Sequence, residues 1–107
     1  MDLKEAKRLA LLKWEFLANT EEQIPKDYFI RIKWIEKNVP ELRELREYAY
    51  CSFCSLYYHR KCEECPVRIE IGGELVNCLN TNHPFSQYRN SSENAKKVLE
   101  IIKNIKV

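Results

Sequence analysis

Two C-x2-C pairs lie close together in the segment CSFCSLYYHRKCEECP (residues 51–66), and a fifth cysteine follows at Cys78. The chain starts at Met1 without an apolar leader or a small-residue cleavage site, so we expect a cytoplasmic protein. Disulfides rarely persist in that reducing compartment, and an odd number of cysteines fits a complete disulfide framework poorly. We therefore predict that these thiols bind a metal ion, which would stabilise this part of a 107-residue chain.

Two sets of four cysteines satisfy a tetrahedral site. One set is Cys51, Cys54, Cys65 and Cys78, and the other replaces Cys78 with Cys62, so that the two C-x2-C pairs form the site. Four thiolates in a tetrahedron are typical of structural zinc sites. The hairpin predicted below slightly favours Cys78 as the fourth ligand and leaves Cys62 as the spare thiol.

Zinc is the predicted metal because structural zinc held by four cysteines is common and needs no assembly machinery. An iron–sulfur cluster is the alternative, since a cysteine followed by proline, as in Cys65-Pro66, recurs in ferredoxins. A second alternative is that the thiols are buried apolar side chains without a metal. His59 and His83 are alternative ligands, although a polar surface or loop-capping role is more typical of such histidines.

Apolar residues at helical spacing predict four helices: residues 3–18, about 27–38, 40 to 57 or 58, and a last helix that opens near Asn90. Asp2 is the expected cap of the first helix, with Glu5 completing a capping box. The predicted inward residues are Leu3, Ala6, Ala10, Trp14 and Leu17, then Tyr28, Ile32, Ile35 and Val39, then Leu42, Leu45, Ala49, Phe53 and Leu56, and finally Ala95, Val98, Ile102 and Ile105.

The first cysteine pair is predicted to lie on the third helix but away from the helical core. Because an α-helix turns by about 100° per residue, Cys51 and Cys54 fall roughly 180° and 120° from Leu42. Residues three apart share a face of a helix. A metal bound there would therefore attach a separate layer to the outside of the helical core.

A β-hairpin is predicted in VRIEIGGELV (residues 67–76), because apolar and polar residues alternate on both sides of two glycines. With the glycines as the loop, Ile71 pairs with Glu74. The chain therefore changes from helical to strand periodicity after the second cysteine pair.

Extension of this register pairs Val67 with Cys78. Cys65, two residues before Val67, then points to the same side of the hairpin as Cys78. Diagonal neighbours in such a pair lie about 7–8 Å apart, within reach of one metal ion. The hairpin is thus expected to bring Cys65 and Cys78 to the same site.

An aromatic and basic surface surrounds the first cysteine pair, formed by Tyr50, Tyr57, Tyr58, Arg60 and Lys61. Such a surface can bind single-stranded nucleic acid by stacking. The simpler interpretation, which we favour, is that the tyrosines shield the metal site while their hydroxyls reach water. The net charge of only +2 also disfavours non-specific binding of nucleic acid, which depends on neutralising phosphates.

No catalytic arrangement is recognisable in the sequence. It contains no glycine-rich phosphate loop and no H-E-x-x-H helix, and a closed metal site lacks the open position that a catalytic zinc needs. We therefore expect a non-enzymatic, zinc-stabilised binding module that engages a protein partner and does not enter a membrane. The alternatives are an iron–sulfur redox or sensor protein and a nucleic-acid-binding adaptor.

The expected architecture is mainly α, because the chain has only two glycines and four prolines. About four helices would form a single domain over residues 1–107, with a small metal-bound β-hairpin layer as an insert at about 51–88. The four helical stripes give this domain a core that is separate from the metal site.

The chain resembles a group of small cysteine-cluster proteins encoded by bacteriophages, prophages and related mobile elements. The resemblance lies in LLKWEFLA, with its Trp-x-x-Leu core, then in CSFC, CEECP and NCLNTNHPFSQY, and it covers most of residues 9–88. The group usually carries a small-Thr-Pro-aromatic turn after the last cysteine, which TNHPF only approximates. No activity is established for that group, so the resemblance implies a small mobile-element accessory protein and no particular chemistry.

Overall fold

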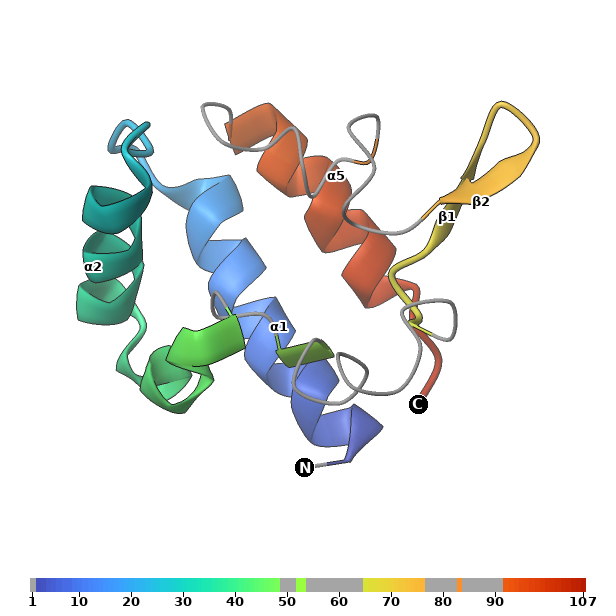
Figure 1. Ribbon diagram of the computed structural model, residues 1–107, viewed down its shortest axis with the longest axis horizontal. Coiled ribbons are helices and arrows are strands. Elements are labelled where there is room, and N and C mark those ends of the chain that lie inside the picture. Colours follow the sequence, from blue (N-terminus) through green and yellow to red (C-terminus); the bar gives the residue numbers. More distant parts are fainter. Residues whose placement is uncertain (1, 49–51, 54–64, 77–82, 84–91) are drawn as a thin grey trace.

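The computed structural model describes residues 2–48, 52–53, 65–76, 83 and 92–107. Within these residues the chain is mainly helical and carries one antiparallel hairpin, as the sequence predicts (Figure 1). The elements are α1 (Leu3–Asn19), α2 (Tyr28–Asn38), the 3-10 helix η1 (Pro40–Tyr48), β1 (Ile69–Ile71), β2 (Glu74–Val76) and α5 (Ser92–Lys103).

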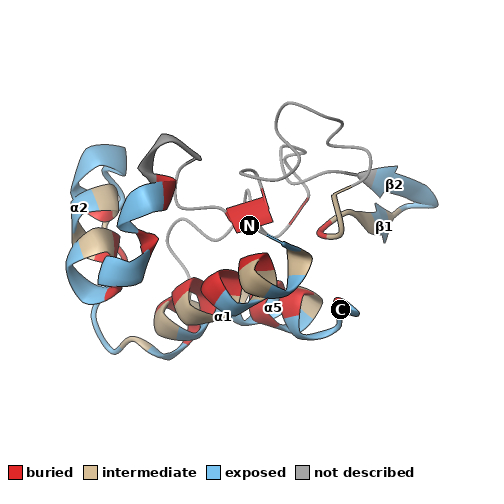
Figure 2. Cartoon of the chain, turned by 90° about the horizontal axis from the view of Figure 1, so that it is seen from below, coloured by how far each residue is buried: buried red, intermediate tan, exposed pale blue. Residues whose placement is uncertain are grey.

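Helices α1 and α5 lie side by side and form the centre of the core (Figures 1 and 2). Alanines on both helices allow the close approach, and larger apolar side chains fill the space around them. The buried residues are Ala6, Leu9, Ala10, Trp14, Leu17 and Ala18 of α1 and Ala95, Val98, Leu99 and Ile102 of α5, with Ile105 beyond it. The predicted stripes of both helices are therefore confirmed, and only Leu3 is partly exposed.

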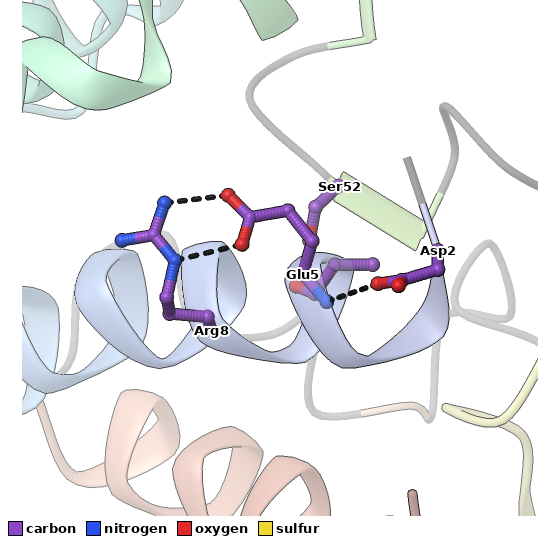
Figure 3. A network of polar contacts seen from close by, with 5 residues as sticks. Asp2, Glu5, Arg8 and Ser52 are labelled. Atoms are coloured by element: carbon purple, nitrogen blue, oxygen red, sulfur yellow. Dashed lines mark hydrogen bonds and ion pairs between the residues drawn. The ribbon is translucent and has the colours of Figure 1, made fainter.

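Side-chain hydrogen bonds stabilise the ends of these two helices. The Asp2 carboxylate accepts a hydrogen bond of 2.8 Å from the Glu5 amide, so the predicted cap of α1 is confirmed (Figure 3). The Glu5 carboxylate does not complete a capping box, because both of its oxygens contact Arg8. At the end of α5, Lys7 donates to the carbonyl oxygen of Ile105 at 2.6 Å and so links the chain after α5 to α1.

Helix α2 packs against η1 through its inner face, where Ile35 is buried. Ile32 is partly buried and Val39, which follows the helix, is buried, as predicted. The prediction that Tyr28 faces the core is wrong, because Tyr28 is 49% exposed. It lies in the first turn of α2, where Arg31 is the buried residue.

The third predicted helix begins at Pro40 but is a 3-10 helix as far as Tyr48, not an α-helix. A 3-10 helix has three residues per turn, so Leu42 and Leu45 lie directly in line, and both are buried as predicted. The angles that place Cys51 and Cys54 away from the core assume an α-helix throughout. These angles therefore do not apply across η1, and the placement of the two cysteines stays a prediction because they lie outside the described residues.

The hairpin has the predicted register, with Ile71 paired to Glu74 and Ile69 to Val76. Gly72 and Gly73 have φ angles of 61° and 85°, which two-residue hairpin turns require and side chains disfavour. The hairpin extends away from the helices at the end of the molecule opposite to α2 (Figure 1).

None of the helices in the described ranges combines the length and apolar character needed to cross a membrane.

Candidate metal centre

Of the seven predicted metal ligands, the structure describes Cys65 and His83. Among the described residues, no group of three or more His, Cys, Asp and Glu side chains is arranged to hold a metal ion. The remaining predicted ligands lie outside the described residues, as does the predicted aromatic and basic surface. These residues are Cys51, Cys54, His59, Cys62 and Cys78, and Tyr50, Tyr57, Tyr58, Arg60 and Lys61.

The two residues inside the first C-x2-C pair are held firmly against the core. Phe53 is 1% exposed, which confirms its predicted inward position, and Ser52 is buried beside it. The Ser52 hydroxyl donates a hydrogen bond of 2.5 Å to the carbonyl oxygen of Ala6 in the first turn of α1. Both residues have helical backbone conformation. Apolar packing and a buried hydrogen bond therefore anchor this segment to α1.

Cys65 opens a β-turn that leads into the hairpin. The amide of Arg68 donates to the carbonyl oxygen of Cys65 at 3.1 Å, and Pro66 and Val67 form the bend. Proline suits this place because its ring fixes the φ angle that the second residue of such a turn needs. Val67 is 1% exposed and Cys65 packs partly buried against the same apolar core.

The turn contradicts the predicted extension of the hairpin. Strand β1 begins at Ile69, so Val67 is part of the bend and Cys65 precedes it. A chain that reverses direction does not keep the alternation of a strand, and Cys65 therefore cannot be assigned to one face of the hairpin. The proximity of Cys65 to Cys78 therefore cannot be derived from the strand register, and it stays a prediction. The position of Cys78 lies outside the described residues.

His83 is completely buried and contacts the Cys65 turn. Its Nε2 lies 2.7 Å from the carbonyl oxygen of Val67. Because a carbonyl oxygen only accepts, the Nε2 atom carries the proton in this hydrogen bond. Of the expected surface or loop-capping role, the surface position does not apply, and the hydrogen bond to Val67 is a contact of the loop-capping kind.

Burial favours the neutral form of the His83 imidazole. Desolvation lowers its pKa below the ordinary value of 6.5, and the hydrogen bond to Val67 opposes this effect only in part. A neutral ring with its proton on Nε2 carries its lone pair on Nδ1. Histidines that bind metals commonly donate the second ring N–H to a backbone carbonyl in this way. Among the described residues His83 therefore anchors the Cys65 turn, and its role as a metal ligand stays a prediction.

Two buried cations were not predicted. Lys13 is 5% exposed with its Nζ 4.9 Å from the centre of the Trp14 ring, and Arg31 is 6% exposed. The Arg31 guanidinium donates to the carbonyl oxygens of Pro25 and Lys26, at 3.3 and 3.2 Å. Arg31 thereby stabilises the loop before α2. Both cations are buried through tertiary packing, which local sequence patterns do not indicate.

The described elements define a small, mainly helical protein with an antiparallel hairpin. Comparison of the chain with protein-family models, with curated proteins and with solved structures gives no match. A function must therefore follow from the chemistry of the chain's own residues.

Proposed function

We propose that the protein is a small, non-enzymatic binding module whose cysteine-rich segment is stabilised by zinc and which engages a protein partner. In line with the resemblance described above, its biological setting would be that of a mobile-element accessory protein. The observation that carries the zinc proposal is the pattern of two C-x2-C pairs and a fifth cysteine in residues 51–78.

The packing on both sides of the cysteine-rich segment supports this proposal. Phe53, inside the first pair, and Val67, just after the second pair, are buried in the same apolar core. The segment between them therefore has both ends held before any metal binds. A short loop with fixed ends loses less conformational entropy when its side chains gather around a metal ion.

Cys65 belongs to both predicted ligand sets and is partly buried at the start of the turn whose Val67 carbonyl His83 contacts. Thiolates and a neutral imidazole are the ligands that zinc prefers. The bound metal would supply a cross-link between the helical core and the hairpin. Cys51 and Cys54 complete either set with Cys62 or Cys78, and His83 is the alternative fourth ligand.

Elemental analysis of protein purified without oxygen tests the metal. We expect about one zinc per chain, because four soft ligands from a single chain form one closed tetrahedral site. Brown protein with stoichiometric iron and sulfide would replace the zinc proposal with an iron–sulfur redox or sensor protein. Protein without either metal would favour buried, metal-free thiols.

Single substitutions identify the fourth ligand. Serine is nearly the size of cysteine but is a poorer ligand in a sulfur shell, so a ligand cannot be replaced without loss of metal. We expect one of Cys62→Ser and Cys78→Ser to keep full zinc content and the other to lose it. Cys65→Ser is the matched control, because it should lose zinc with either set. Full zinc content in both test variants would favour His83 as the fourth ligand. In that case His83→Gln should lose the zinc.

A further inference from the structure

Three consecutive apolar side chains are exposed at the start of α2. Tyr28 is 49% exposed, Phe29 is 74% exposed and Ile30 is 60% exposed. Consecutive residues on an α-helix point about 100° apart, so they cannot all face one core. Other large exposed apolar residues in the described part of the chain, Leu75 and Val107, lie apart from this run. A contiguous apolar patch of this kind is typical of an interaction surface.

The patch continues into a groove of about 450 Å³ between α2 and η1. The α2 residues of the groove are spaced three and four apart, so they share one face of the helix. Arg43 of η1 forms the opposite side. The residues that line the groove are Phe29, Ile32, Lys33, Glu36, Lys37 and Arg43.

The groove carries an excess of positive charge. Arg43 and Glu36 form an ion pair across it, with 3.2 Å between Nε and Oε1, and Glu36 is largely covered. Lys33 and Lys37 are exposed, and neither forms an ion pair with another residue in the part of the chain that the structure describes. One carboxylate thus faces three cations, and it is already paired with one of them.

We propose that this groove binds an acidic amphipathic helix of a partner protein. Apolar side chains of the partner would pack on Phe29 and Ile32, and its carboxylates would lie beside Lys33 and Lys37. The eleven residues of α2 extend over about 16 Å, which matches about three turns of a docked helix. Among the described residues, Phe29 is the one aromatic residue that lines the groove, whereas single-stranded nucleic acid stacks successive bases on several aromatic rings, which favours a protein partner.

Designed peptides test this proposal with the whole 107-residue chain as purified. The probe is a fluorescent three-turn amphipathic helix with leucines on one face and glutamates on the flanks. A peptide with lysines in place of the glutamates and a scrambled acidic peptide are the comparisons. We expect the acidic amphipathic peptide to bind at least about tenfold more tightly than either, with weaker binding at high salt.

Matched variants locate the binding. Lys33→Glu combined with Lys37→Glu, and separately Phe29→Ser, should each weaken binding by about tenfold, because they reverse the charge or remove the apolar contact. Lys96→Glu combined with Lys97→Glu is the control, since these two lysines are exposed on α5. It should change the affinity less than about twofold. Circular dichroism confirms that each variant is folded, which the exposure of the substituted residues leads us to expect.

Three outcomes would overturn the proposal. Equal binding of the acidic and basic peptides would remove the argument from charge. Tighter binding of a single-stranded oligonucleotide than of the acidic peptide, lost in the Lys33→Glu, Lys37→Glu variant, would assign the groove to nucleic acid. Concentration-dependent association of the protein with itself, abolished by Phe29→Ser, would assign it to a second copy of the chain. None of these outcomes depends on the metal proposal, because zinc content is measured independently in each sample.

Discussion

If the chain binds zinc as proposed, its removal with a strong chelator is expected to disorder the hairpin region, residues 59–88, while much of the helical signal remains. A metal bound only by the folded chain adds its binding free energy to folding, about 4 kcal/mol at a metal concentration a thousandfold above the dissociation constant. The loss should lower Tm by on the order of 20 °C in a domain of this size. The apolar core between α1 and α5 is expected to persist, because none of its residues is a predicted ligand.

Far-ultraviolet circular dichroism and amide hydrogen exchange measure the two parts separately. Amides of Ile69–Ile71 and Glu74–Val76 should exchange much faster after chelation, whereas those of α1 and α5 should change little. Return of zinc should restore protection of the hairpin, which serves as the control for irreversible damage. Complete loss of helical signal on chelation would mean that the metal, rather than the helical core, organises the fold.

The part of the fold that the sequence predicts best is the part with a regular period. The apolar stripes of α1 and α5 recur every three or four residues, and Asp2 is a typical helix cap, so both helices follow from local chemistry. The hairpin follows from the adjacent glycines, Gly72 and Gly73, since few other residues accept their positive φ angles.

The differences arise where two local patterns compete. In η1, the spacing of Leu42 and Leu45 by three residues fits a 3-10 helix as well as an α-helix, and only packing decides between them. At Cys65-Pro66, alternation favours a strand while proline favours a turn, and the turn forms. The proline was therefore the signal that the strand begins later.

The candidate site is less predictable because it depends on contacts between distant residues. Nothing near His83 in the sequence indicates that it is buried against Val67, sixteen residues earlier. The exposed run at Tyr28, Phe29 and Ile30 could be recognised, since three consecutive apolar residues cannot all face inward on a helix. Which of them stays exposed depends on how α2 packs, and that is a tertiary property.

Substitution of Phe53 by alanine is expected to be the most damaging single change in the described core. Phe53 is 1% exposed and is among the largest fully buried side chains there. Replacement of a buried phenylalanine by alanine removes apolar contacts and leaves a cavity, at a cost of about 3–5 kcal/mol. Stabilities of small domains are about 5–15 kcal/mol, so Phe53→Ala should lower the free energy of unfolding by a large fraction. Chemical denaturation measures this change.

Phe29→Ala is the matched control, because it makes the same chemical change at a side chain that is 74% exposed. It should alter the free energy of unfolding by less than about 0.5 kcal/mol.

A second comparison, between the metal-loaded and the chelated protein, shows to which part of the fold Phe53 belongs. Since Phe53 packs with α1 and α5 in one apolar cluster, its substitution should destabilise both forms by similar amounts. A loss confined to the metal-loaded form would instead place Phe53 with the metal-bound layer, and the first C-x2-C pair would then be organised by the metal rather than by the helical core.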